Sequence, residues 1–136
     1  MIVKSKINKK PLFLIKKYFK KKIRKTREDL TDKNKFLQVS LLNLKKDMNF
    51  SPHVHLRHVK KTYISSEAWI VISGKLRVIF YDLDKSKVYE DVLKRGDISI
   101  LFEGGHVFKP LTKNTIIFEI KNGPYLGPKK EKENIR

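Results

Sequence analysis

Short runs of β-branched and aromatic residues, separated by turn residues, are the feature that most restricts the fold of this chain. Such runs are typical of strands. Glycine, asparagine, aspartate and serine occupy the intervals, where tight turns need them. The five clearest runs are residues 36–44, 67–72, 75–81, 99–102 and 115–120. The pattern predicts an all-β fold, and the regular turns between short strands indicate a closed barrel.

Residues 75–81 show the strand pattern most clearly. Leu76, Val78 and Phe80 fall on one side of this strand, and that fully apolar side should face the interior. The whole strand region is small, so it buries only about 60 to 65 % of the surface of its unfolded chain. We therefore expect a homodimer formed through edge strands. The aromatic side chains expected to fill the barrel are Trp69, Phe80, Phe102 and Phe118.

Positive charge is concentrated at the N-terminus. The 136 residues include 32 Lys and Arg against 14 Asp and Glu, a net charge of +18, and residues 1–27 hold twelve cations and no anion. This segment is compatible with a helix on an anionic membrane, a sequence-independent binder of nucleic-acid phosphates, or a solvated arm. Because base-specific readout relies on arginine forks and only six of the cations are arginine, nucleic acid is the less favoured partner.

The same segment carries a helical pattern. Leu12, Ile15, Phe19 and Ile23 fall on one stripe of a 3.6-residue helix, and Pro11 suits its first turn. A basic, helical N-terminal arm is therefore predicted. The predicted domains are the arm at residues 1–33, a β-barrel at 34–126 and a C-terminal tail at 127–136.

Several classes of protein are excluded by what the sequence lacks. It has no cysteine, so disulfides, thiolate zinc sites and cysteine nucleophiles are ruled out. No stretch free of charged residues exceeds nine residues, far below the roughly 18 needed to span a bilayer. The N-terminal apolar run is also too short for a secretion signal. We expect a cytoplasmic protein, peripheral to the membrane if the arm binds lipid.

The histidines are the most informative polar residues. His53, His55 and His58 lie within six residues of one another, and His106 follows a predicted strand. On a strand, residues i and i+2 share a face about 6.6 Å apart, so His53 and His55 can converge on one ion. His58 lies among lysine and arginine residues and is interpreted as solvated.

Glu67 adds a carboxylate to this set. It shares a strand face with Trp69 and Val71, and an unpaired carboxylate buried on such a face is costly. A divalent cation beside two imidazoles would remove that cost, and such sites suit Fe, Mn or Ni. The alternative is that the histidines are loop residues and that Glu67 reaches solvent at the end of its strand.

The spacing of these residues resembles the two sequence motifs of the cupin superfamily. The matching parts are His53-Val-His55, Glu67 with Gly74, and the segment from Gly96-Asp97 to Gly104-Gly105-His106. The resemblance covers about residues 36–126 and implies a jelly-roll barrel that binds a divalent transition metal, Fe, Mn, Ni or Zn. The metal ligands that it implies are His53, His55, Glu67 and His106.

This chain also departs from the family pattern. Eleven residues, 56–66, separate His55 from Glu67 where the family usually has three or four, so an enlarged loop is expected. Phe102 replaces the usual proline of the second motif, and only Gly105 separates Gly104 from His106.

The resemblance also suggests a reaction. The Gly-Gly-His segment and residues 118–125 are similar to small cupins associated with surface-polysaccharide sugar pathways. This implies isomerisation or epimerisation of a sugar or sugar nucleotide at the metal. The candidate catalytic residues are His55, Tyr63 and Tyr81, with Lys109 as a further acid-base candidate. Without a metal, His55 would act as the general base.

A function of a different class stays open. The chain would then be a non-catalytic module that binds a small ligand or dimerises. Its basic arm would recruit it to an anionic membrane or to nucleic acid.

Overall fold

The computed structural model describes residues 1–18 and 25–135. The described residues form ten strands and one short helix, which confirms the all-β prediction. The elements are β1 (Ile2–Lys4), β2 (Pro11–Lys16), β3 (Arg27–Asp29), β4 (Ser40–Leu42), β5 (Glu67–Ser73), β6 (Lys75–Tyr81), β7 (Lys87–Lys94), β8 (Ile98–Leu101), β9 (Gly105–Pro110), β10 (Ile116–Lys121) and α1 (Pro128–Glu131).

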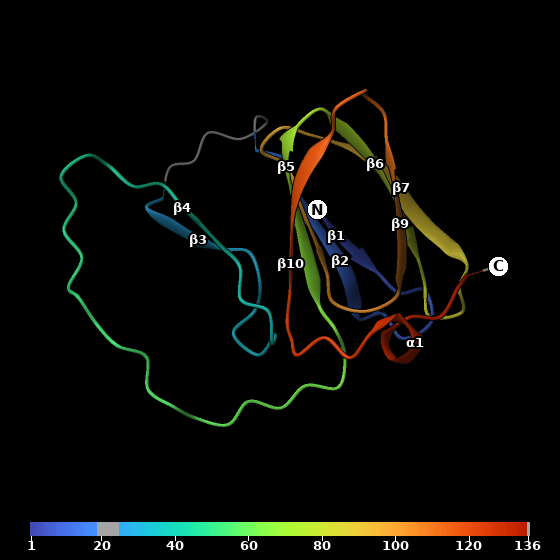
Figure 1. Cartoon of the computed structure of the whole chain (residues 1–136), viewed down its shortest axis with the longest axis horizontal. Helices are drawn as coiled ribbons and strands as arrows, with labels where there is room; N and C mark the ends of the chain where they lie inside the picture. Colours follow the sequence, from blue (N-terminus) through green and yellow to red (C-terminus); the bar gives the residue numbers. More distant parts are fainter. Residues whose placement is uncertain (19–24, 136) are drawn as a thin grey trace.

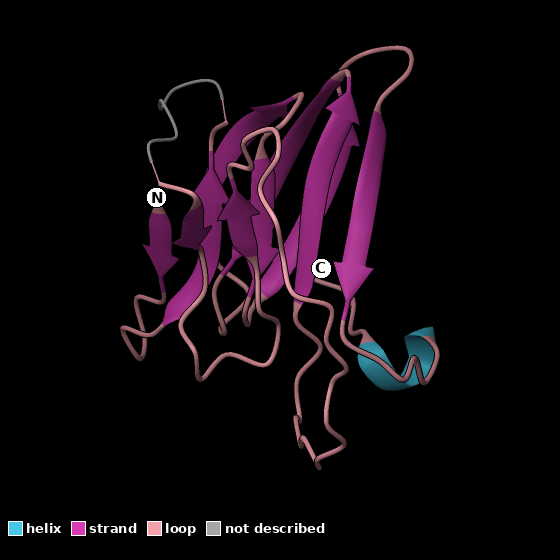
Figure 2. Ribbon diagram, turned by 90° about the vertical axis from the view of Figure 1, so that its left-hand side faces the viewer, coloured by secondary structure: helices cyan, strands magenta, loops and turns pink. Residues whose placement is uncertain are grey.

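Two antiparallel sheets face each other and enclose the core (Figures 1 and 2). The larger sheet has the strand order β1-β2-β8-β5-β10, and the smaller has the order β7-β6-β9. β3 and β4 form a separate two-stranded ribbon. Four of the five expected runs form the strands β5, β6, β8 and β10, whereas only the central part of 36–44 does so, as β4.

The core lies between the two sheets. Phe13 of β2, Trp69 of β5 and Phe80 of β6 are fully buried, and the ring centroids of Phe13 and Phe80 are 4.0 Å apart. Leu76, Val78 and Phe80 are at most 3 % exposed, so the predicted inward face of β6 is confirmed.

The prediction that Phe118 fills the core is wrong. Its side chain is 62 % exposed. β10 pairs with β5 so that Glu119 stands opposite the buried Trp69 and Phe118 opposite Ile70. Because side chains alternate along a strand, this register turns Phe118 away from the core.

The predicted N-terminal helix is wrong over the residues that the structure describes. Leu12 and Ile15 lie in β2, which pairs with β1 on one side and β8 on the other. β2 is covered on both faces, so its apolar residues form an unbroken run. Such a run fits a buried strand and a helix equally well, so periodicity alone does not distinguish them. Phe19 and Ile23 lie outside the described residues.

Between β4 and β5 the chain makes a long excursion. Residues 42–64 are all exposed, and this segment arcs away from the two sheets (Figure 1). The enlarged loop expected before Glu67 lies here. Among the described residues, no helix has the length and apolar character to cross a membrane.

Candidate functional site at Glu67 and His106

Glu67 is the first residue of β5 and lies almost entirely out of solvent. It is 4 % exposed, and it shares the inward face of β5 with Trp69 and Val71, both fully buried. The sequence expectation that this carboxylate lies on an apolar face is therefore correct. β5 places Glu67 opposite Leu101 of β8 on one side and Lys121 of β10 on the other.

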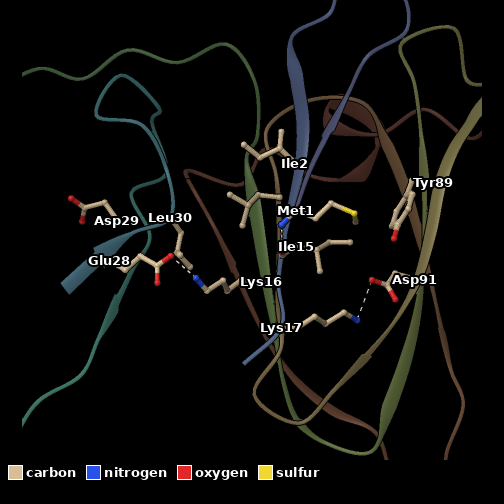
Figure 3. A pocket seen from close by; sticks show the side chains of 11 residues that line it. Met1, Ile2, Ile15, Lys16, Lys17, Glu28, Asp29, Leu30, Tyr89 and Asp91 are labelled. Carbon is tan, nitrogen blue, oxygen red and sulfur yellow. Dashed lines mark hydrogen bonds and ion pairs between the residues drawn. The ribbon is translucent and has the colours of Figure 1, made fainter. Parts of the chain in front are cut away.

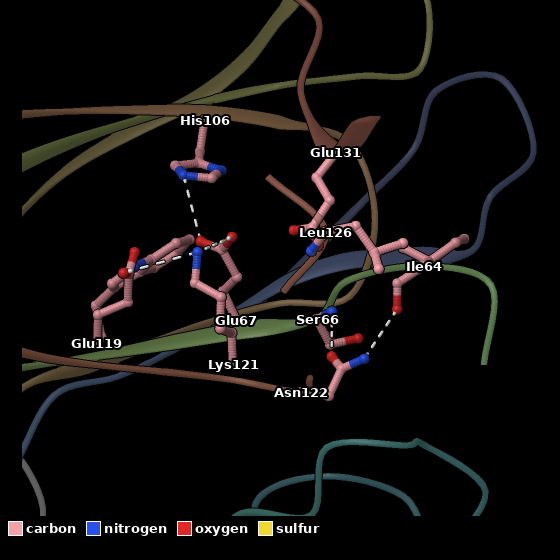
Figure 4. A network of polar contacts seen from close by, with 10 residues as sticks. Ile64, Ser66, Glu67, His106, Glu119, Lys121, Asn122, Leu126 and Glu131 are labelled. Atoms are coloured by element: carbon pink, nitrogen blue, oxygen red, sulfur yellow. Dashed lines mark hydrogen bonds and ion pairs between the residues drawn. The ribbon is translucent and has the colours of Figure 1, made fainter. Parts of the chain in front are cut away.

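His106 reaches Glu67 from the opposite sheet. The imidazole Nε2 atom lies 3.6 Å from Oε2 of Glu67 (Figure 4). The ring also packs on Trp69 and Phe108, with centroid separations of 4.5 and 5.2 Å. Since the side chain of His106 is 20 % exposed, it contacts both the aromatic core and the solvent.

Lys121 and Glu119 of β10 extend this pair into a network of alternating charges (Figure 4). Nζ of Lys121 donates to Oε1 of Glu67 at 3.2 Å and lies 3.7 Å from Oε2 of Glu119. Nε1 of Trp69 donates to Oε1 of Glu119 at 3.2 Å. The polar side of β10 thus lines one end of the space between the sheets.

Two pKa shifts follow from this environment. Burial lowers the pKa of His106 below its usual 6.5, and the nearby Glu67 carboxylate only partly opposes that effect. Burial also acts to lower the pKa of Lys121, but the hydrogen bond and charge of Glu67 outweigh it, so the pKa of Lys121 is raised. At neutral pH the site therefore holds a neutral imidazole and a protonated Lys121.

One carboxylate oxygen of the site, Oε2 of Glu67, is buried and could accept a hydrogen bond, but it receives none from the described residues. A protonated His106 or a bound cation would satisfy it, because both can interact with a carboxylate oxygen. Lys121 already supplies one positive charge to the other oxygen of Glu67.

The structure brings together only two of the four predicted metal ligands. His53 and His55 lie in the exposed segment between β4 and β5, with their rings 5.3 Å apart. Within the described ranges no three His, Asp or Glu side chains are grouped so that they could hold a metal ion. The eleven-residue loop before Glu67 separates the His-x-His pair from the sheets.

The other catalytic candidates lie in the exposed segment and in the smaller sheet. Tyr63 is 98 % exposed in the same segment as His55. Tyr81 is half-buried at the end of β6, opposite Gly105, and Lys109 is exposed on β9.

Sequence reasoning missed Lys121 and Glu119. The signal was the alternation in residues 116–121, where Glu119 and Lys121 share one parity with Ile117, and the apolar residues Ile116, Phe118 and Ile120 share the other. Without the register to β5, nothing indicated that the charged side would face inward.

A surface groove of about 620 Å³ lies elsewhere, between β1, β2, β3 and β7 (Figure 3). Its lysines are paired: Lys16 binds Glu28, and Nζ of Lys17 lies 3.1 Å from Oδ2 of Asp91. None of its lining residues belongs to the Glu67 network. The charged side chains that line the groove are engaged in ion pairs, so the Glu67–His106 pair is the better candidate site.

Comparison with known proteins gave no match: no protein-family model fits the chain, and no curated protein or solved structure is significantly similar to it. The chemistry of Glu67, His106 and Lys121 is therefore the basis on which a function can be assigned.

Proposed function

We propose that this protein is an enzyme that transfers protons on a small oxygenated substrate, through isomerisation or epimerisation of a sugar or sugar nucleotide. The observation that carries this proposal is the 3.6 Å contact between Nε2 of His106 and Oε2 of Glu67. A histidine beside a carboxylate is an effective general base, because the carboxylate stabilises the imidazolium that forms. His106 takes the role that the sequence suggested for His55.

Each group of the site has a part in this reaction. His106 accepts a proton from the carbon next to the substrate carbonyl, since its lowered pKa keeps it neutral at pH 7. The Lys121 ammonium stabilises negative charge that develops on the carbonyl oxygen. Trp69 and Phe108 hold the imidazole ring in place and exclude water from one side of it. Returning the proton to the neighbouring carbon, while the hydroxyl proton of the enediolate passes from one oxygen to the other, completes an isomerisation. Returning it to the other face of the same carbon completes an epimerisation.

The architecture supports the same proposal. Two facing antiparallel sheets with the candidate site at one end suit the jelly-roll that the cupin resemblance implies. We propose that fold for the two sheets, which include β1 and β2 from the segment that the sequence assigned to an arm.

Proton exchange gives a direct test. The protein is incubated in D₂O with free sugars and sugar nucleotides, and loss of the proton next to the carbonyl is followed by NMR. His106→Gln should slow exchange by about 10² to 10⁴. The matched control, His58→Gln, changes a histidine in the exposed segment and should have no effect. Equal exchange by wild type and His106→Gln would refute the proposal.

A metal-dependent form of the reaction is supported by the unpartnered Oε2 atom of Glu67. Glu67 and His106 would hold the ion, and His53 and His55 would complete the set if their segment approached the sheets. A bound ion would polarise the substrate carbonyl. Purified protein should then contain stoichiometric Fe, Mn, Ni or Zn, and Glu67→Gln should lose it. Absence of metal, with a melting temperature unchanged by chelators, would eliminate this form and leave the proton transfer to His106 standing.

Recruitment to an anionic surface is the alternative, supported by the net charge of +18. Deleting residues 1–27 cannot test it, because β1 and β2 belong to the larger sheet. Charge reversal of the exposed Lys9 and Lys10, next to β2, keeps the strands intact. Sedimentation with phosphatidylserine vesicles should fall in this variant but not in Lys113→Glu, an exposed lysine elsewhere. Wild type that fails to sediment would exclude the alternative.

A further inference from the structure

The two faces of β10 are the opposite of those expected for a strand at the surface of a monomer: its apolar side chains face solvent, and its charged side chains face the core. Ile116, Phe118 and Ile120 point outward and are 58, 62 and 45 % exposed. Glu119 and Lys121 instead bind Trp69 and Glu67 on the inward side. A strand at the surface normally turns its apolar side to the core. A row of three large apolar side chains in solvent therefore indicates a surface that another chain covers.

β10 is also an edge strand. It pairs with β5, and no described strand occupies its other edge. On the neighbouring part of the same outer face, Leu30, Leu37 and Val39 pack over the buried residues of β5 and β8. These residues therefore cover β5 and β8 but not β10. At β10 an unpaired strand edge and an apolar surface lie together. An exposed, apolar edge strand is a template for pairing with another chain.

The chain carries its own complement to this edge in the exposed segment between β4 and β5. Val54 and Leu56 are 85 and 81 % exposed, and they alternate with His53, His55 and Arg57. This is a strand pattern, with one apolar and one polar side. Placed beside β10, the segment would put its apolar residues next to Phe118 and Ile120, and its histidines next to Glu119 and Lys121.

We propose that a second copy of this chain covers β10, with residues 53–57 of each copy lying along β10 of the other. The exposed segment and the free edge are on the same chain, so two copies related by a twofold axis satisfy each other. The segment arcs away from its own sheets (Figures 1 and 2). Both ends of the segment, residues 43–66, are attached to strands of the same chain, so residues 53–57 near its middle can reach about 30 Å from them when the flanking residues are extended.

The end of this excursion, just before β5, is held in place next to β10. Asn122 follows β10, and its Oδ1 atom accepts from the backbone N–H of Ser66 at 2.6 Å. Its Nδ2 atom donates to the carbonyl of Ile64 at 3.3 Å. The segment therefore rejoins the larger sheet at the end of β10, beside the edge that the second copy occupies.

Sedimentation equilibrium tests the proposal on the full chain. Wild type should be dimeric, and Phe118→Ser should weaken the dimer by about 100-fold, because the substitution removes a large apolar contact twice in a twofold interface. Phe118 is exposed in the single chain, so the variant should keep the wild-type circular dichroism spectrum. Leu83→Ser, at an exposed leucine outside this surface, is the control and should remain dimeric. A monomeric wild type, or a Phe118→Ser variant as dimeric as wild type, would overturn the proposal.

Cysteine trapping identifies the segment that makes the contact. The chain has no native cysteine, so introduced thiols report only their own pairing. Val54→Cys protein mixed with Phe118→Cys protein should form a disulfide-linked heterodimer on mild oxidation, whereas Val54→Cys mixed with Leu83→Cys should not. When both substitutions are placed in one chain, a disulfide within single chains would overturn the proposal, since each segment would then cover its own β10.

Discussion

The pair formed by Glu67 and Lys121 gives a quantitative prediction about stability. Glu67 is 4 % exposed, and its Oε1 atom accepts from Nζ of Lys121 at 3.2 Å. Lys121→Met would leave both carboxylate oxygens unpaired. Breaking a fully buried ion pair costs about 3 to 5 kcal/mol. Because the side chain of Lys121 is 23 % exposed and partly screened, we expect a loss of about 2 kcal/mol above neutral pH.

The loss should shrink as the pH falls, because His106 can replace the missing charge. In wild type, burial holds the pKa of His106 below 6.5, so the unfolded chain binds the proton more readily. The contribution of His106 to the stability of wild type is therefore fully present above pH 6.5, and it decreases as the pH falls toward the lowered pKa. Without Lys121, the unpaired Glu67 should raise the pKa of His106 above 6.5. The variant then gains stability below pH 6.5 and loses it as the pH rises through the raised pKa.

Urea unfolding followed by the fluorescence of Trp69, the single tryptophan, measures this difference. The free energy of unfolding is compared at about pH 5.5 and about pH 8, on either side of the usual histidine pKa. Lys113→Met, at an exposed lysine in a turn, should match wild type at both values. If Lys121→Met costs the same free energy at both pH values, His106 does not interact with Glu67 as the geometry indicates.

Three further predictions concern the sheets and the site. A Cβ atom at Gly74, where φ is +78°, would lie 2.4 Å from Oγ1 of Thr112, so Gly74→Ala should cost about 1 to 3 kcal/mol. Gly127→Ala, with nothing within 4 Å of the added atom, should lower the calorimetric melting temperature less, and equal shifts would contradict the geometry. Phe80→Ala should cost about 3 to 5 kcal/mol in urea unfolding, because the ring is fully buried; a loss below 1 kcal/mol would show that it is not part of the core. In wild type the free energy of unfolding should rise with pH up to pH 6.5, and His106→Gln should abolish this rise. If the variant keeps the same pH dependence, another group binds the proton.

Part of the candidate site was predictable from local pattern. Alternation put Glu67 on the apolar face of its strand, and the structure decided that it is buried there rather than reaching solvent at the strand end. The relation of His106 to Glu67 came from the cupin resemblance, and the structure places the two in contact. Lys121 was missed because its position depends on pairing between β10 and β5, which join residues about fifty positions apart. The same motif linked His53 and His55 to the site. Because a long loop follows them, their position depends on contacts with distant residues, which the local sequence pattern does not predict.

The sequence by itself determined which segments are strands where one face is apolar, as in β5 and β6, because alternation is a local property of the chain. Tertiary structure decided the rest. β2 is a strand because β8 supplies its backbone partners, although its apolar spacing suits a helix equally well. Phe118 faces solvent because the register with β5 assigns the inward positions of β10 to Glu119 and Lys121. Register and pairing depend on residues far apart in the sequence, and their free energy is gained only when the sheets assemble.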